Sequence, residues 1–290
     1  MDCNIEDFEQ IVKTTKRQIV IVDTQWVLYK SHYAFKEYFN NQGMPIGHIH
    51  GLLMLIQNLC KLNCEVFLSL EGNCTSRKEL VSEYKAQREN SALGTMFIND
   101  YGRINDLMSN LVNVHLIQSD SYESDDVMFT AAKICEKHKK ICFIHTLDKD
   151  LYQAISPTTF VSNKITSGGI QDIVDINSKK YTEWFQDLKP QELPIYRAFK
   201  GDASDNIRPV VERFPTKLAM ELAKYMYEHN GTLQGFPVGK NASWMKKLID
   251  NWQTFLNNYK IMQLKQIEFS IIPKAMPRFL ETFNWTLQIE

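Results

Sequence analysis

The chain has 290 residues, of which 44% are hydrophobic and 23% charged, as is typical of a globular protein with a sizeable core. Its 33 Lys and Arg residues are balanced by 34 Asp and Glu residues, so the formal net charge is −1 at pH 7. This balance excludes a basic field over the whole chain, so any binding to nucleic acid must depend on local patches. No apolar run is long enough to span a membrane, and the length suits one large domain or two.

The cysteine spacing indicates free thiols rather than a disulfide or zinc framework. None of the six cysteines forms a Cys-x-x-Cys pair, and Cys60 and Cys64 have no matching second pair. Reduced, buried thiols are typical of the cytoplasm. The N-terminal residues also lack the apolar core of a signal peptide. We therefore expect a cytoplasmic protein, in the host cytoplasm if the source is viral, with no membrane partner.

The first 180 residues alternate between predicted strands and predicted helices. Short apolar runs rich in β-formers predict strands over residues 18–22, 64–70, 114–117, 141–144 and 158–162. Helical spacing predicts helices over residues 26–39, 48–62, 77–88, about 100–111, and from residue 123 onward. The segment 164–176, which carries Gly168-Gly169, is predicted to form a hairpin or a turn. This alternation favours an α/β fold with a parallel central sheet flanked by helices.

From about residue 180 the chain becomes mainly helical. Helical periodicity marks residues 190–200, 215–228 and 242–263. We therefore divide the chain into an α/β core, residues 1–180, and a C-terminal helical annex, residues 181–290. The tail after residue 267 is rich in β-formers and is not assigned to an element.

Acidic residues recur just beyond the predicted strands of the core, and a further pair follows a helix of the annex. In chain order they are Asp23, Glu71, Glu123, Asp125, Asp126, Asp148, Asp150, Asp202 and Asp205. Because the carboxyl ends of parallel strands meet at one edge of an open sheet, we expect these carboxylates to lie together. Taken alone, the acids at residues 123–126 could simply cap a helix and complement its dipole. Asp148 and Asp150 alone could equally mark an ordinary turn.

A crowded set of carboxylates needs cations, because the negative charges would otherwise repel one another. Oxygen ligands without His or Cys select Mg²⁺ or Mn²⁺. Two such ions, about 4 Å apart, suit in-line hydrolysis of a phosphodiester with water as the nucleophile. The sequence therefore predicts a metal-dependent hydrolase with two divalent ions.

Five sequence blocks follow one another between residues 19 and 217. They are Ile21-Val22-Asp23 with Leu28-Tyr29, Arg77 with Glu79-Leu80 and Tyr84-Lys85-Ala86-Gln87-Arg88, Glu123-Ser124-Asp125-Asp126, Asp148-Lys149-Asp150-Leu151, and Gly201-Asp202-Ala203-Ser204-Asp205-Asn206-Ile207. In this order and with these gaps, they resemble the blocks of the phage and bacterial 5′-nuclease (flap endonuclease) family. That family includes the 5′-nuclease domain of bacterial DNA polymerase I.

The resemblance implies a PIN-like nuclease core and structure-selective cleavage in DNA replication. The substrate would be DNA with a free 5′ end or flap, or an RNA–DNA hybrid, and replication proteins could be partners. In that family the acids up to Asp126 hold one metal ion, and the acids of the last two blocks contribute to the second. Lys85 and Arg88 match basic residues that face the scissile phosphate from a helical arch, here about residues 77–112. On the predicted helix they would share one face.

The sequence departs from the family pattern at three places. Glu71 stands where the family usually has Asp, and the longer side chain would change the metal spacing. Thr24 follows Asp23 where Gly is common. Residues 208–217 lack the glycines of a hairpin that brings backbone N–H groups close to phosphate. Duplex binding is then expected to depend on Arg208, Arg213 and Lys217, although these charges could also be a solvated surface. Arg77 and Tyr84 of the second block are further expected contacts with DNA.

Two other functions fit parts of the pattern. One is a DNA-binding protein of the same fold with a degenerate metal site, and the intact acid sets argue against it. The other is an α/β ribonuclease acting on single-stranded RNA, and the helical annex argues against that. The expected function is therefore a metal-dependent 5′-3′ exonuclease and flap endonuclease.

Overall fold

One sheet organises the chain, which the computed structural model describes at residues 4–72, 75–86 and 92–274. Across this described part, the strand order is β6-β5-β4-β1-β2-β3-β7. The strands are β1 (Gln18–Asp23), β2 (Cys64–Ser69), β3 (Val114–Gln118), β4 (Cys142–His145), β5 (Thr159–Thr166), β6 (Gly169–Val174) and β7 (Ser270–Ile271). Strands β1 to β5 run parallel, whereas β6 and β7 pair antiparallel at the two edges. The predicted parallel central sheet is confirmed.

Strand β1 lies at the centre of the sheet because it is apolar on both faces. Ile19 and Ile21 belong to the core on one side, and Val20 and Val22 to the core on the other. Such strands are typical of parallel sheets that helices cover on both faces. Asp23, the last residue of β1, pairs in register with the last residue of β2. The segments that follow these strands therefore start from the same edge.

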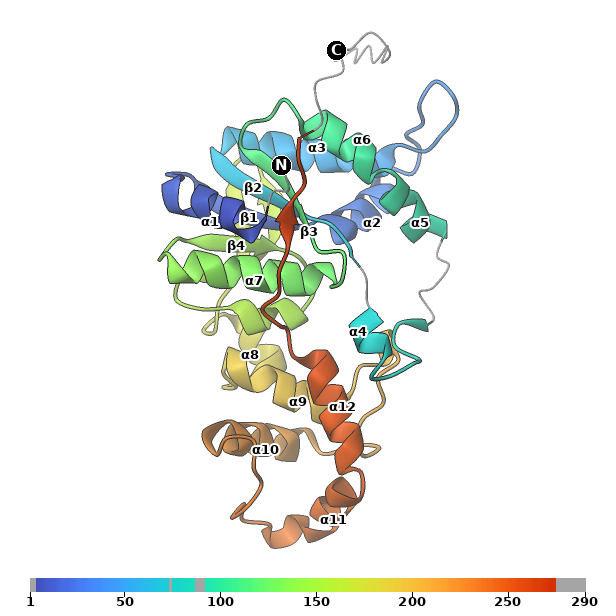
Figure 1. The fold of residues 1–290 in the computed structure, drawn as a ribbon. Coiled ribbons are helices and arrows are strands. Elements are labelled where there is room, and N and C mark those ends of the chain that lie inside the picture. Colours follow the sequence, from blue (N-terminus) through green and yellow to red (C-terminus); the bar gives the residue numbers. More distant parts are fainter. Residues whose placement is uncertain (1–3, 73–74, 87–91, 275–290) are drawn as a thin grey trace.

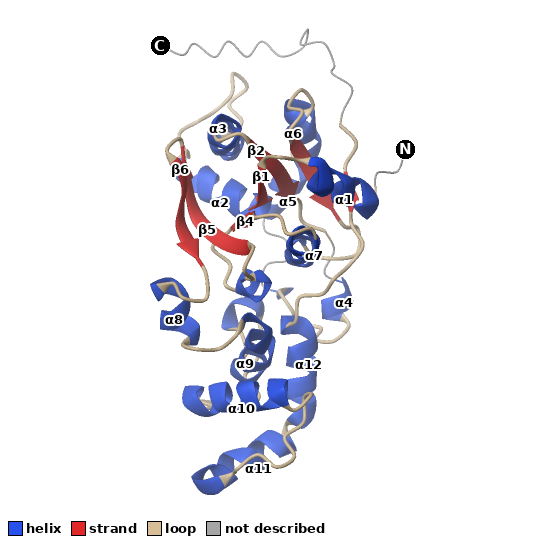
Figure 2. Ribbon diagram, turned by 90° about the vertical axis from the view of Figure 1, so that its left-hand side faces the viewer, coloured by secondary structure: helices blue, strands red, loops and turns tan. Residues whose placement is uncertain are grey.

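Helices cover both faces of the sheet (Figures 1 and 2). One face packs against α1 (Ile5–Thr14) and α7 (Ser124–Lys137). The other face packs against α2 (Thr24–Ala34), α3 (Gly47–Lys61), α5 (Ala92–Asn99) and α6 (Tyr101–Met108). Within the described ranges, no helix combines the length and hydropathy needed to cross a membrane.

Beyond one end of the sheet lies a group of helices (Figure 1). These are α8 (Lys179–Phe185), α9 (Leu193–Lys200), α10 (Thr216–Glu228), α11 (Ala242–Asp250) and α12 (Trp252–Met262), joined in part by the short 3₁₀ turns η3 (Pro190–Glu192), η4 (Ala203–Asp205) and η5 (Gly239–Asn241). After α12 the chain returns to the sheet, where β7 pairs with β3. The last described residues thus lie against the α/β core, although the sequence placed them in the annex.

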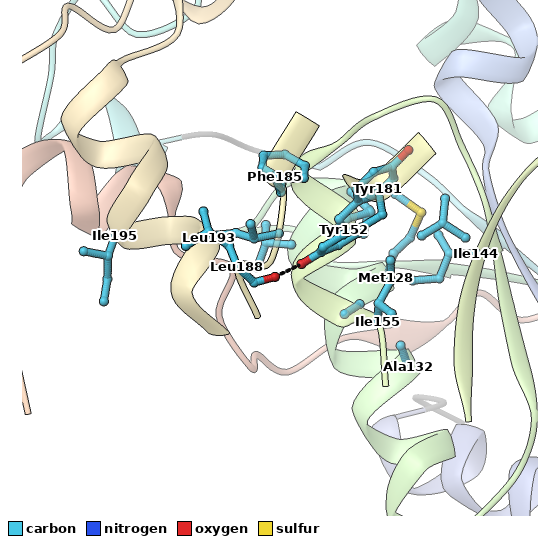
Figure 3. Close-up of a cluster of buried hydrophobic side chains, with 14 of the residues drawn as sticks. Met128, Ala132, Ile144, Tyr152, Ile155, Tyr181, Phe185, Leu188, Leu193 and Ile195 are labelled. Atoms are coloured by element: carbon cyan, nitrogen blue, oxygen red, sulfur yellow. Dashed lines mark hydrogen bonds between the residues drawn. The ribbon is translucent and has the colours of Figure 1, made fainter. Parts of the chain in front are cut away.

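The hydrophobic core is continuous between the sheet and these helices (Figure 3). Tyr152, in the 3₁₀ turn η2 (Asp150–Ala154), stacks on Tyr181 of α8 with ring centroids 5.8 Å apart. The Tyr181 hydroxyl donates a buried hydrogen bond of 2.9 Å to the Leu188 carbonyl. The hydrophobic core therefore continues across the division near residue 180, and the division itself into an α/β core and a packed helical annex remains a prediction.

The helix predicted over residues 77–88 is wrong. Helix α4 covers only Thr75–Lys78, and turns follow, in which Lys85 has a positive φ of 52°. Tertiary contacts override the helical spacing here, because the side chains of Arg77 and Tyr84 are buried among acids. Of the predicted arch, about residues 77–112, the described part is helical at α4, α5 and α6. Residues 87–91, which include Arg88, lie outside the described residues.

Replacing Tyr181 by Phe should lower the free energy of unfolding by about 1–2 kcal/mol, because the buried Leu188 carbonyl loses this donor. Tyr227→Phe is the matched control, since Tyr227 is 43% exposed on α10 and its change should stay within about 0.5 kcal/mol. Urea unfolding measures both. Equal stabilities for the two variants would show that the hydrogen bond contributes nothing.

Candidate active site

Four carboxylates follow four parallel strands at one edge of the sheet, and we call them the sheet-edge carboxylates. Asp23 ends β1, Glu71 follows β2, Asp125 lies in the first turn of α7 after β3, and Asp148 follows β4. Burial raises the pKa of Asp125, and the nearby negative charges of Asp148, Asp23 and Glu71 raise it further. The four carboxylates therefore lie near one another. The structure thus brings together the four acids that the strand ends were expected to place.

The nine acids do not form one cluster. Within the described ranges, no three Asp, Glu, His or Cys side chains already converge into a group that could hold an ion. The acids divide instead into the sheet-edge carboxylates, a buried pair held by Arg77 and Lys85, and a set around Arg197. The physical reason is that protein cations draw several of the carboxylates into ion pairs.

Three of the sheet-edge carboxylates, Asp23, Glu71 and Asp125, are difficult to charge in this environment. Burial raises the pKa of Asp23 to about 6 and that of Glu71 to about 7. Burial, followed by repulsion from Asp148, also holds the pKa of Asp125 well above its ordinary value. Raised carboxyl pKa values show that a charged group lacks sufficient positive partners. A divalent cation would supply that positive charge.

Asp23 is fixed by its local structure. It is the N-cap of α2, where Oδ1 accepts a hydrogen bond of 3.0 Å from the Trp26 backbone N–H. Its other oxygen, Oδ2, accepts one of 2.8 Å from the Thr146 hydroxyl. Both bonds orient the carboxyl group at the end of β1.

Glu71 is held beside the start of α7. Its Oε2 accepts a hydrogen bond of 3.3 Å from the Ser124 hydroxyl, and its carbonyl accepts one of 2.7 Å from the Gln118 side chain. The next residue must be glycine, because a Cβ at Gly72 would lie 2.0 Å from the Ser119 carbonyl oxygen. The Glu71 carboxylate thus lies close to Asp125.

Glu123 and Asp126 form a buried pair around Arg77. Nη1 of Arg77 lies 2.7 Å from Asp126 Oδ2 and also bonds to Glu123, and Nη2 donates to Asp126 Oδ1 at 2.9 Å. The third donor, Nε, bonds to the Ile261 carbonyl at 3.2 Å. Asp126 Oδ1 also accepts from the Lys265 backbone N–H. These contacts give Glu123 and Asp126 a structural role, and metal binding by them remains a prediction.

The prediction that Arg77 and Tyr84 contact DNA conflicts with their burial. Each is only 4% exposed. The Tyr84 hydroxyl donates to Glu123 Oε2 at 3.0 Å, beside the bond from Arg77. The Arg77 guanidinium and the Tyr84 hydroxyl thus already donate to a buried carboxylate, because an uncompensated carboxylate in the interior would be strongly unfavourable.

Lys85 reaches the acids from a turn. Its ammonium pairs with Glu123, and although burial opposes its charge, that carboxylate raises the pKa of Lys85 well above its ordinary value. The Lys85 backbone N–H donates to the Asp205 carbonyl at 3.1 Å, and the Asn206 side chain donates to the Glu83 carbonyl at 3.1 Å. The start of the predicted arch is therefore tied to the last acidic block.

A tight loop presents the last acidic block. Helix α9 ends at Gly201, whose φ is 66° and where a Cβ would lie 2.5 Å from the Ile207 carbonyl oxygen. Asp202 then pairs with Ile207 across the loop, and Asn206 takes the left-handed conformation. Asp202 Oδ1 accepts hydrogen bonds from the Ser204 N–H at 2.8 Å and hydroxyl at 2.6 Å. The loop thus fixes Asp202 facing α9.

Arg197 of α9 joins acids from two blocks, and the sequence analysis missed it. Its Nη2 lies 3.0 Å from Asp150 Oδ1 and 2.5 Å from Asp202 Oδ2. Burial raises the pKa of Asp150 to about 7 even though Arg197 opposes that rise. The available signal is a basic residue five positions before Asp202, but it lies within a helix whose apolar periodicity dominates the pattern.

The basic residues after this loop are exposed. Arg208 has 83% of its side chain exposed, 3.9 Å from Glu83, and Arg213 and Lys217 are exposed as well. Arg213 has a positive φ of 56°, so the glycine-free segment still makes a turn before α10. All three side chains are available to a ligand, as their assignment to DNA requires.

Comparisons with known proteins identify the family to which this fold belongs. Residues 18–186, more than half of the chain, match the family model "5′-3′ exonuclease, N-terminal resolvase-like domain". The chain is 26% identical over 257 residues to the 5′-3′ exonuclease of Buchnera aphidicola from Acyrthosiphon pisum, covering 85% of this chain and 86% of that one. It is 26% identical over 214 residues to Bacillus subtilis DNA polymerase I, covering 73% of this chain and 24% of the polymerase.

Solved structures show the same fold. T5 5′-exonuclease with bound zinc superimposes with a TM-score of 0.63 at 18% identity, covering 86% of this chain and 90% of that one. The catalytic core of Rad2 in complex with DNA gives 0.54 at 13% identity, covering 90% and 83%. The fold and its acidic edge define a resolvase-like α/β nuclease. The chain belongs to the 5′-3′ exonuclease family, so the assignment made from the five blocks is confirmed.

Arg77→Met should lower the free energy of unfolding by about 3–5 kcal/mol, because it leaves Asp126 as an uncompensated buried charge and leaves Glu123 with Lys85 as its only cation among the described residues. Arg208→Met is the control, because it removes an exposed arginine and should change the free energy of unfolding by less than about 0.5 kcal/mol.

A double-mutant cycle with Asp126→Asn completes this test. The double variant should be more stable than the sum of the single losses predicts, by at least about 1 kcal/mol, because the two groups are in direct contact. Strict additivity would contradict the ion pair.

Proposed function

We propose that the protein is a metal-dependent, structure-selective 5′-3′ exonuclease and flap endonuclease that acts on DNA with a free 5′ end or flap, in DNA replication. The observation that supports this best is the gathering of Asp23, Glu71, Asp125 and Asp148 where four parallel strands end. Its relatives carry the names of 5′-3′ exonucleases and DNA polymerase I. An RNA–DNA hybrid is a second possible substrate, and other replication proteins are possible partners. The proposed compartment is the cytoplasm, that of the host if the chain is viral.

The proposed cofactor is Mg²⁺ or Mn²⁺, with two ions. The sheet-edge carboxylates fit such an ion by their chemistry, because all four are oxygen donors. The raised pKa values of Asp23, Glu71 and Asp125 mark a deficit of positive charge. The acids at Asp150, Asp202 and Asp205 are proposed to contribute to the second position. When bound, the ions supply an activated water and neutralise charge on the phosphoryl oxygens.

The chain's own cations have two proposed tasks. Lys85 and Arg88 neutralise the scissile phosphate, and for this Lys85 must exchange Glu123 for a phosphate oxygen. Arg208, Arg213 and Lys217 contact the duplex backbone from their exposed positions. The ion pair with Glu123 holds the Lys85 ammonium near the sheet-edge carboxylates until substrate arrives.

Asp125→Asn should abolish cleavage of a 5′-labelled flap in Mg²⁺, because it removes one central carboxylate, and should lower the single-turnover rate at least about 10²-fold. Flap binding in Ca²⁺ should persist. The matched control is Asp120→Asn, an exposed acid five residues earlier in the same segment, which should cleave normally.

The same assay separates the alternative functions. Binding of the flap by the unaltered protein without cleavage in Mg²⁺ or Mn²⁺ would favour a degenerate DNA-binding protein. Cleavage of single-stranded RNA alone would favour a ribonuclease.

Binding of Mg²⁺ should release protons near pH 6. In the metal-free fold, Asp23 and Glu71 keep protons up to about pH 6 and 7, whereas an unfolded chain releases them at about pH 4. The folded chain therefore binds more protons in this window, and metal-free stability falls as the pH rises through it. An ion favours the charged carboxylates and reverses this loss at neutral pH.

Calorimetric titration of Mg²⁺ at pH 6, in two buffers with different ionisation enthalpies, measures the proton release. The observed heats should differ between the buffers and converge towards pH 8. Identical heats at pH 6 would show that these carboxyl groups are already ionised.

A further inference from the structure

Arg197 links two carboxylates that come from distant parts of the chain. Asp150 follows β4 in the core, and Asp202 follows α9, yet both contact the same guanidinium nitrogen at 3.0 and 2.5 Å. The three side chains are only 16–20% exposed, so water screens their charges little. Asp148 and Asp205 also act on the pKa of Arg197 and so lie near it. The arginine therefore stands among the acids proposed to hold the second ion.

The bonding of Arg197 is incomplete. One nitrogen serves both carboxylates, while Nε is buried without a hydrogen-bond partner in the described part of the chain. A forked, two-nitrogen contact with a single carboxylate would be stronger. A buried ion pair whose remaining donors are unsatisfied is weakly stabilising, because desolvation offsets much of its attraction.

Arg77 provides the internal comparison. Its Nη1, Nη2 and Nε all donate to protein acceptors, including the backbone of α12. That arginine is built into the interior with every side of its guanidinium engaged. Arg197 has the same type of partners but lacks this saturation, so its contact with the carboxylates is the one suited to exchange.

We propose that Arg197 is an internal counter-ion of Asp150 and Asp202, and that a divalent ion must displace its guanidinium to bind there. This inference rests on the proposed metal-dependent function and names the residue that controls the second ion. In the metal-free protein, Arg197 keeps the two acids together and limits their repulsion. When an ion binds, the carboxylates exchange the guanidinium for the ion. The second ion therefore binds more weakly than the first, because it competes with a cation of the protein.

Binding of Mn²⁺ to the DNA-free protein tests this, with the electron paramagnetic resonance signal of free Mn²⁺ as the readout. Arg197→Met keeps most of the aliphatic length and removes the charge. It should tighten the weaker Mn²⁺ site at least about 10-fold, equal to about 1.4 kcal/mol, and change the tighter site much less. Lys224→Met is the control, since it removes one cation from an ion pair with Asp187 on the helices beyond the sheet. It should change neither site.

Arg197→Gln is the second variant, because a neutral amide can still donate a hydrogen bond if the Met variant does not fold. It should tighten the weaker site in the same direction. An unchanged weaker site in a folded Arg197 variant would overturn the inference and leave Arg197 as a purely structural residue. A single Mn²⁺ site in both the unaltered protein and the variants would also overturn it.

The failure of this inference is distinguishable from that of the proposed function. If the unaltered protein cleaves the flap but its Mn²⁺ binding does not respond to Arg197, only the counter-ion role is wrong. If the unaltered protein neither binds Mn²⁺ nor cleaves the flap, the proposed function fails, and the counter-ion role fails with it.

Discussion

Repulsion among partly buried carboxylates at one edge of a parallel sheet is the constraint on which the rest of this structure depends. Parallel strands all end at the same edge, so the acids that follow β1, β2, β3 and β4 are forced together by topology. Water is scarce there, and the pKa values of Asp23, Glu71 and Asp125 rise as a result. Cationic side chains from outside the sheet form ion pairs with neighbouring carboxylates and so reduce the negative charge at this edge. Arg77 and Lys85 enter between β2 and α5, and Arg197 enters from α9.

These cations also connect the parts of the molecule. Arg77 bonds to the Ile261 carbonyl at the end of α12, and Asp126 accepts from the Lys265 backbone just beyond it. The Gln153 side chain adds bonds to the backbone of residues 262 and 264. The chain leaving α12 is thus guided back to the sheet, where β7 pairs with β3. Asp126, which the sequence pattern assigns to metal binding, therefore helps to position the segment that leads from α12 back to the sheet.

The sequence predicts those features that depend on local pattern and on the topology of parallel strands. Apolar runs predict β1 and β4, and Asp23 and Asp148 follow these strands at the edge where the parallel topology predicts them. It does not predict features that depend on which side chain fills the interior. Arg77 and Tyr84 have helical spacing, but burial against Glu123 ends the helix at Lys78. Arg197 lies within a helix whose sequence pattern is mainly apolar, so its role is not apparent from spacing. Strand β7 is too short for an alternation of polar and apolar residues to be recognised. A partner contributed by a distant segment leaves no local signal.

The contrast between Arg77 and Arg197 shows why burial alone does not define the role of a charged side chain. Both arginines are held among carboxylates, and both have raised pKa values despite burial. The difference lies in the hydrogen bonds that remain. Every nitrogen of Arg77 has an acceptor, so removing Arg77 leaves the buried Asp126 without a counter-charge among the described side chains, and Glu123 paired with Lys85. Arg197 holds its acids through one nitrogen, and burial raises the pKa of Asp150 even though the guanidinium opposes that rise. A saturated arginine fixes the fold, whereas an unsaturated one leaves its carboxylates open to a stronger cation.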